Sequence, residues 1–115
     1  MRQLSIFFIV VLLLVLQSCS KDNIATNTPA CIRKEIKSHD KNWKIGSIDE
    51  YLFQNRVVYA FAPDGRIIAD SSTEIKDENC NQICTVGGFG GPQIKQCNGE
   101  NFFQTAVFKR SIWKK

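Results

Sequence analysis

The strongest constraint on the fold comes from four cysteines, Cys31, Cys80, Cys84 and Cys97. In an exported domain of about 100 residues, four cysteines are typical of two disulfides, which compensate for a small apolar core. In a reducing compartment the same residues would be free thiols or metal ligands. The fifth cysteine, Cys19, follows an apolar N-terminal run. The compartment therefore has to be inferred first.

The first twenty residues predict export. Arg2 precedes an uninterrupted apolar run over residues 6–16, which has the length of a signal-peptide core and is too short to span a bilayer. The sequence Leu16-Gln17-Ser18-Cys19 resembles the bacterial lipobox. That resemblance implies cleavage before Cys19, a diacylglyceryl thioether on its sulfur, and an acyl chain such as palmitate on its new N-terminus. Two or more acyl chains give stable anchoring.

The residues after Cys19 bear on sorting. Ser20 stands where an aspartate would favour retention in the inner membrane, so we expect the outer membrane. Ser20-Lys21-Asp22 also partly resembles a surface-export signal, and both the periplasmic side and the cell surface stay open. We predict a signal peptide over residues 1–18, a flexible tether over 19–29 and one small domain over 30–115.

In an oxidising envelope, Cys31, Cys80, Cys84 and Cys97 are expected to form two disulfides. Three pairings are possible. Cys80–Cys84 is the least favourable, because a turn would have to bring two nearby positions into disulfide geometry. Cys31 is expected to pair with Cys84 or Cys97 and so tie a helix to a sheet. With His39 as the only histidine, we predict no metal site and no cofactor.

The pattern of apolar residues predicts an α+β fold, in which a short N-terminal helix packs on a small antiparallel sheet. Thr28 is expected to cap the helix, with Pro29 at its first position and its end near Ser38. Residues 50–61 alternate around Gln54-Asn55-Arg56 as a hairpin. Further short strands are expected over residues 66–70, 73–77 and 81–86. Residues 101–113 are ambiguous, because Phe103, Val107 and Trp113 fit a helix imperfectly while Val107-Phe108 suits a strand.

A glycine-rich loop follows Cys84. The sequence Gly87-Gly88-Phe89-Gly90-Gly91 lacks the Gly-Lys-Ser/Thr ending of a phosphate-binding loop. The glycines are expected to supply unusual backbone angles within a disulfide-stapled loop. Phe89, an aromatic residue among glycines, is the candidate binding residue.

Charge and composition argue against two classes of function. The net charge of +4 is low for a nucleic-acid-binding protein, which usually carries a dense basic stripe. The basic tail over residues 109–115 is expected to be solvated or to touch anionic lipid headgroups. A single histidine excludes most catalytic triads, and the acidic pairs Asp49-Glu50 and Asp77-Glu78 are expected to be solvated. We therefore predict that the protein is not an enzyme.

The sequence DENCNQICTVGGFGG with a downstream cysteine, followed by NFFQ and IWK, resembles a family of small lipoproteins of Gram-negative bacteria known as a domain of unknown function. The resemblance covers roughly residues 30–114 and implies architecture and location, without an activity. We predict a lipid-anchored, non-catalytic module that binds a protein or another envelope component. The alternatives are a structural or stress-related envelope lipoprotein without a ligand, and an inhibitor of an extracellular hydrolase.

Overall fold

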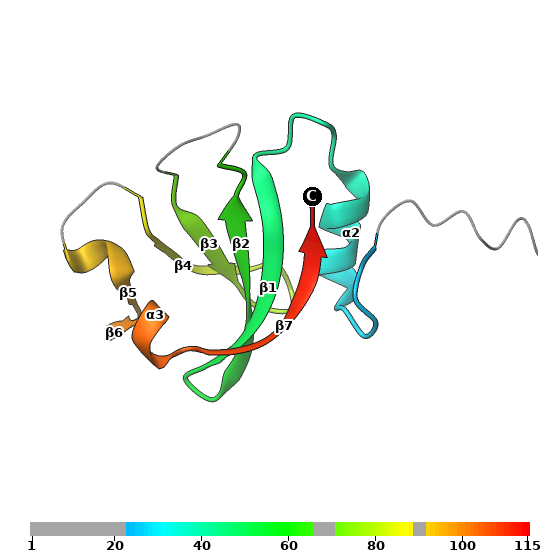
Figure 1. Ribbon diagram of the computed structural model, residues 1–115. Coiled ribbons are helices and arrows are strands. Elements are labelled where there is room, and N and C mark those ends of the chain that lie inside the picture. The colour runs from blue at the N-terminus through cyan, green and yellow to red at the C-terminus, as the bar shows by residue number, and fades with distance from the viewer. Residues whose placement is uncertain (1–22, 66–70, 89–91) are drawn as a thin grey trace, which may run out of the picture.

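The computed structural model describes residues 23–65, 71–88 and 92–115 (Figure 1). One antiparallel sheet has the strand order β4-β3-β2-β1-β7. Its strands are β1 (Ile45–Phe53), β2 (Arg56–Pro63), β3 (Thr73–Lys76), β4 (Gln82–Val86) and β7 (Val107–Lys114). The helix α2 (Ala30–Ser38) packs on this sheet. The predicted α+β class and its short N-terminal helix on an antiparallel sheet are confirmed.

A second cover lies on the opposite side of the sheet from α2 (Figure 1). It consists of short elements: η1 (Pro92–Lys95), β5 (Gln96–Cys97), β6 (Glu100–Asn101) and α3 (Phe102–Thr105). Asn101 caps α3, because its side-chain oxygen accepts a hydrogen bond from the backbone N–H of Gln104 at 3.3 Å. The ambiguous region over residues 101–113 therefore contains both kinds of structure, a single helical turn followed by β7.

The hairpin at the centre of the sheet forms as predicted. Phe53 pairs with Arg56, and the two residues between them, Gln54 and Asn55, have φ angles of 50° and 61°. Two consecutive left-handed residues define the tight turn whose twist matches that of paired strands, and asparagine tolerates this conformation well. Strand β4 also pairs with β3 as expected.

Alternation along the strands builds a core on each face of the sheet. The first apolar cluster lies beneath α2 and contains Ile32, Ile36, Ile48, Tyr59, Phe61, Ile112 and Trp113. The second lies beneath η1, β5 and α3 and contains Phe53, Val58, Ala60, Ile75, Val86, Cys97 and Phe102. Strand β2 contributes successive residues to opposite clusters, which is why its middle reads as a continuous apolar run.

Both disulfides are present, but the expected partner of Cys31 is wrong. Cys31 bonds to Cys80, with 5.9 Å between their Cα atoms, and Cys84 bonds to Cys97, with 5.6 Å. Cys80 lies in the turn before β4 with a φ of 64° and packs against the cluster beneath α2. Cys84 lies on β4 and packs against the opposite cluster, so it cannot reach the helix.

Helix α2 begins one residue later than expected. Pro29 is extended, with a ψ of 145°, and occupies the N-cap position without a capping side-chain bond. Thr28 does not cap the helix either. It is buried, and its hydroxyl donates a hydrogen bond to the backbone oxygen of Ala25 at 2.6 Å. Thr28 therefore closes a turn with Ala25. Both residues belong to residues 23–29, which we name the N-terminal segment.

The N-terminal segment, which was expected to belong to the tether, contacts the sheet. The backbone N–H of Ala25 donates to the carbonyl of Ile112 in β7 at 2.9 Å. The guanidinium of Arg110 donates to the carbonyls of Thr26 and Asn27. These bonds fix the segment against the edge strand, so the domain begins well before residue 30.

Several predictions lie outside the described residues. These are the signal peptide, lipidation of Cys19, the strand over residues 66–70, and the binding residue Phe89 with Gly90 and Gly91. Gly87 and Gly88 do adopt left-handed conformations, with φ of 86° and 87°, as expected for the loop. Within residues 23–65, 71–88 and 92–115, no helix is long and apolar enough to cross a membrane.

Candidate functional site

A pocket of about 330 Å³ opens between the C-terminal end of α2 and strands β2 and β3. Its volume is at the lower end of the range for small-ligand sites. The pocket brings together aromatic, acidic and basic side chains from four parts of the chain. They are Glu35, Ser38, His39, Asp40, Trp43, Ile45, Phe61, Glu74 and Lys76.

Lys76 forms the charged floor of the pocket. Its Nζ lies 3.3 Å from both carboxylate oxygens of Glu35 and 3.6 Å from Oε2 of Glu74. The same ammonium group lies 4.5 Å from the ring centroid of Phe61, a distance at which the ring face attracts a cation. Because the side chain of Lys76 is only 14% exposed, these contacts fix its charge between helix and sheet. With Asp40 also at the rim, carboxylates outnumber cations in the pocket.

An aromatic wall closes one side. The rings of His39 and Trp43 are stacked, with centroids 5.0 Å apart, and Trp113 contacts both rings from the core. His39 Nδ1 donates a hydrogen bond to the carbonyl of Ile36. Nε2 is therefore the ring nitrogen left to meet a ligand.

The arrangement is suited to binding a polar or cationic group. Exposed carboxylates accept hydrogen bonds and attract positive charge. The face of a tryptophan ring also attracts a cation. The hydroxyl of Ser38 donates to the backbone oxygen of Glu35 at 3.3 Å, so it is used in closing the helix. Among the described residues, no group of three or more histidine, cysteine or acidic side chains is placed to hold a metal ion.

Asp77, from one of the acidic pairs, has a structural role. Its Oδ1 accepts the backbone N–H groups of Asn79 and Asn81 at 2.9 Å each, and its Oδ2 lies 3.6 Å from the guanidinium of Arg56. The hydrogen bond from the Asn81 backbone is the main cause that lowers the pKa of Asp77. These bonds shape the turn that presents Cys80 to α2. Within the motif DENCN, Asp77 therefore orders the turn and Cys80 forms the disulfide to the helix.

Glu50, from the other acidic pair, holds the N-terminal segment in place. Its Oε1 accepts the hydroxyl of Tyr59 at 3.2 Å and the guanidinium of Arg110 at 3.3 Å, and its side chain is only 15% exposed. Burial, with the Glu50 charge beside it, raises the pKa of Tyr59 to about 12. The expectation that Glu50 and Arg110 are solvated is therefore wrong.

A second exposed feature lies at the other end of β7. Phe103, Val107 and Phe108 are 58%, 55% and 56% exposed. Phe108 contacts Tyr51 edge-on, with ring centroids 5.7 Å apart, so part of this apolar strip covers the core. Neither this strip nor the pocket was predicted from the sequence. A signal for the pocket was available, since His39, Asp40 and Trp43 stand close together just after the predicted helix.

These features define a small, disulfide-stapled α+β domain with a pocket at the end of α2. A family model for a domain of unknown function, DUF6970, matches residues 34–115. The chain therefore belongs to this family, as the resemblance predicted. No curated protein matches the chain, and no solved structure does.

Proposed function

We propose that this protein is a lipid-anchored envelope protein whose domain binds a protein or peptide ligand without catalysing a reaction. The proposed anchor is Cys19, supported by the signal-like start and the lipobox-like sequence before it. Ser20 after the cysteine supports the outer membrane. The observation that carries the binding role is the pocket at the end of α2, with its fixed lysine, acidic rim and aromatic wall.

The chemistry of the pocket favours a basic side chain of the ligand. Glu35 is already paired with Lys76, but Glu74 is 41% exposed and keeps unused acceptor positions. A guanidinium or ammonium group entering beside Trp43 would meet this carboxylate, Asp40 and the aromatic face together. A neutral or acidic side chain would gain neither the attraction to the carboxylates nor the attraction of a cation to the Trp43 ring face.

Short peptides test the pocket directly. The lipidated protein in detergent micelles is titrated with tripeptides that differ only in the central residue, arginine, lysine, alanine or glutamate, while the backbone N–H signals of His39 and Asp40 are followed by NMR. We expect saturable shifts with arginine and lysine only. Trp43→Ala and Glu74→Gln should weaken binding, whereas Phe108→Ala, at the distant end of β7, should leave it unchanged. Equal or absent shifts for all four peptides would reject the pocket and favour the structural alternative.

The anchor is tested separately. Mass spectrometry of the purified protein should find the acyl modification on Cys19, and Cys19→Ser should release the protein from membranes or leave an unprocessed precursor. An unmodified Cys19 in membrane-bound protein would contradict the proposed anchor.

Envelope pull-downs with wild type, Phe89→Ala and Trp43→Ala would then show which aromatic residue selects a partner. Identical partner lists for wild type and Phe89→Ala would remove Phe89 as the binding residue.

A further inference from the structure

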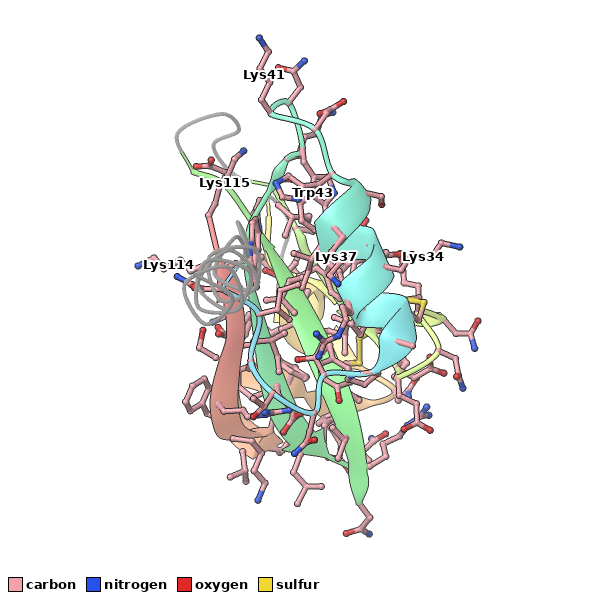
Figure 2. All side chains as sticks on the ribbon, turned by 90° about the vertical axis from the view of Figure 1, so that its right-hand side faces the viewer. Lys34, Lys37, Lys41, Trp43, Lys114 and Lys115 are labelled. Carbon is pink, nitrogen blue, oxygen red and sulfur yellow. A yellow bond between two sulfur atoms is a disulfide. The ribbon has the colours of Figure 1, made fainter. Side chains whose placement is uncertain are left out.

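One face of the domain carries a cluster of lysines. Figure 2 views α2 from outside and shows Lys34 and Lys37 on the helix and Lys41 after it. All three are exposed. Within the described ranges, they form no ion pair with a carboxylate. We name these three lysines the basic face.

The fold separates these charges from nearby acids. Residues 34 and 37 are three positions apart, a spacing that brings helical side chains to one side, and Lys41 follows in the turn after the helix. Glu35, on the same helix, instead turns to Lys76 in the pocket. Lys115 is excluded from the basic face because its ammonium lies 3.4 Å from Asp64 and donates to the carbonyl of Trp43.

The second observation is the short distance from the domain to the proposed lipid. The N-terminal segment is fixed to β7 by Ala25 and Arg110, and the described chain begins at Asn23. Cys19 is four positions earlier, and four residues span at most about 14 Å when fully extended. A lipid on Cys19 would therefore hold the start of the domain close to the headgroups. In Figure 2 the N-terminal segment runs across the same face as the lysines.

We propose that the basic face docks on anionic phospholipid headgroups, so that the domain lies on the membrane with α2 toward it. This inference rests on the proposed anchoring at Cys19. A Debye length of about 8–10 Å at physiological salt lets lysines beside the surface interact with its charge. The short connection favours a membrane over a soluble acidic partner, because it brings only the membrane within reach at all times.

Lysine modification tests the orientation. The purified lipidated protein is reconstituted into vesicles of phosphatidylcholine alone and into vesicles of an equal mixture with phosphatidylglycerol, and acetylation of each lysine is timed by mass spectrometry. We expect Lys34, Lys37 and Lys41 to react several-fold more slowly in the mixture, and concentrated salt to remove the difference. Lys95, exposed on η1 across the sheet, should react equally in both.

Charge variants make the test specific. Lys34→Gln with Lys37→Gln should remove most of the several-fold protection of Lys41, because one lysine at an anionic surface contributes a factor of about five. The matched control, Lys95→Gln with Lys109→Gln, removes the same charge and should leave that protection unchanged.

Each remaining outcome overturns one of the two proposals. An unmodified Cys19 would contradict the anchor itself. A lipidated protein whose lysines react equally in both kinds of vesicle would keep the anchor and overturn the docking. Protection that persists in concentrated salt, or that arises only when soluble envelope proteins are added to neutral vesicles, would also overturn docking on lipid, the latter in favour of an acidic protein partner.

Discussion

The two faces of the sheet are covered in different ways. One face lies beneath α2, a regular helix whose Ile32 and Ile36 are completely buried. The other lies beneath residues 92–106, where the longest element has four residues. Each cover has one disulfide, but the Cys31–Cys80 bond closes 49 residues and the Cys84–Cys97 bond closes 13.

The difference shows what each disulfide contributes. Helix α2 satisfies its own backbone hydrogen bonds, and its disulfide joins segments that are far apart in the chain. The opposite cover has few regular hydrogen bonds of its own. It depends on one aromatic anchor, Phe102, whose ring packs on Tyr51 and Phe53 at centroid distances of 5.2 and 5.1 Å. The long-range disulfide should therefore stabilise the whole domain, and the short one should mainly keep its own cover in place.

The largest expected effect is loss of the long-range disulfide. Cys31→Ala with Cys80→Ala should lower the free energy of unfolding by about 4 kcal/mol, the chain-entropy value for a loop of this length. That is a large share of the 5–15 kcal/mol typical of small domains. Denaturant unfolding under oxidising conditions measures it. Stability equal to that of wild type would contradict the view that this bond constrains the chain.

The second prediction concerns the short disulfide. Cys84→Ala with Cys97→Ala should cost less, about 3 kcal/mol on the same scale, and its consequences should be local. Hydrogen exchange should accelerate over residues 92–106 and stay near wild-type rates in α2. If exchange accelerates equally in α2, the two covers unfold as one unit and the distinction between them is lost.

The local features of the fold were predictable from the sequence. Alternation and the Gln54-Asn55 turn determine the hairpin, and the amphipathic pattern determines α2. The partner of Cys31 could not be derived, because it depends on the left-handed conformation of Cys80 and on which face β4 presents. The pocket was missed for a similar reason. Its acidic and basic groups come from α2 and β3, whose contact is set by the packing of helix on sheet.

The third prediction concerns the turn that carries Cys80. Asp77→Ala removes the acceptor for two backbone N–H groups, so the melting temperature should fall by less than on losing the disulfide itself. The lowered pKa of Asp77 means that its contribution is present above the ordinary pKa and is lost as pH falls through the folded-state value. The melting temperatures of wild type and Asp77→Ala should therefore differ near neutral pH and converge in strong acid. A constant difference would show that the ionised carboxylate is not what orders the turn.

The smallest effect uses the two tyrosines as reporters of the two faces. Tyr59 lies beneath α2, and burial together with Glu50 raises its pKa to about 12. Tyr51 packs on Phe102 on the opposite face, and its pKa is raised chiefly by burial. Because the neutral phenol is favoured in the folded state, this stabilisation is complete below the unfolded-state pKa of about 10 and is lost as pH rises through the folded-state values.

Glu50→Gln removes the negative charge and keeps a hydrogen-bond acceptor, so the pKa of Tyr59 should fall toward 10 while that of Tyr51 stays unchanged. Carbon-13 NMR titration of the two phenol rings measures both values. A shift of both tyrosines would mean that Glu50 acts across the sheet, and that its two faces are electrostatically coupled.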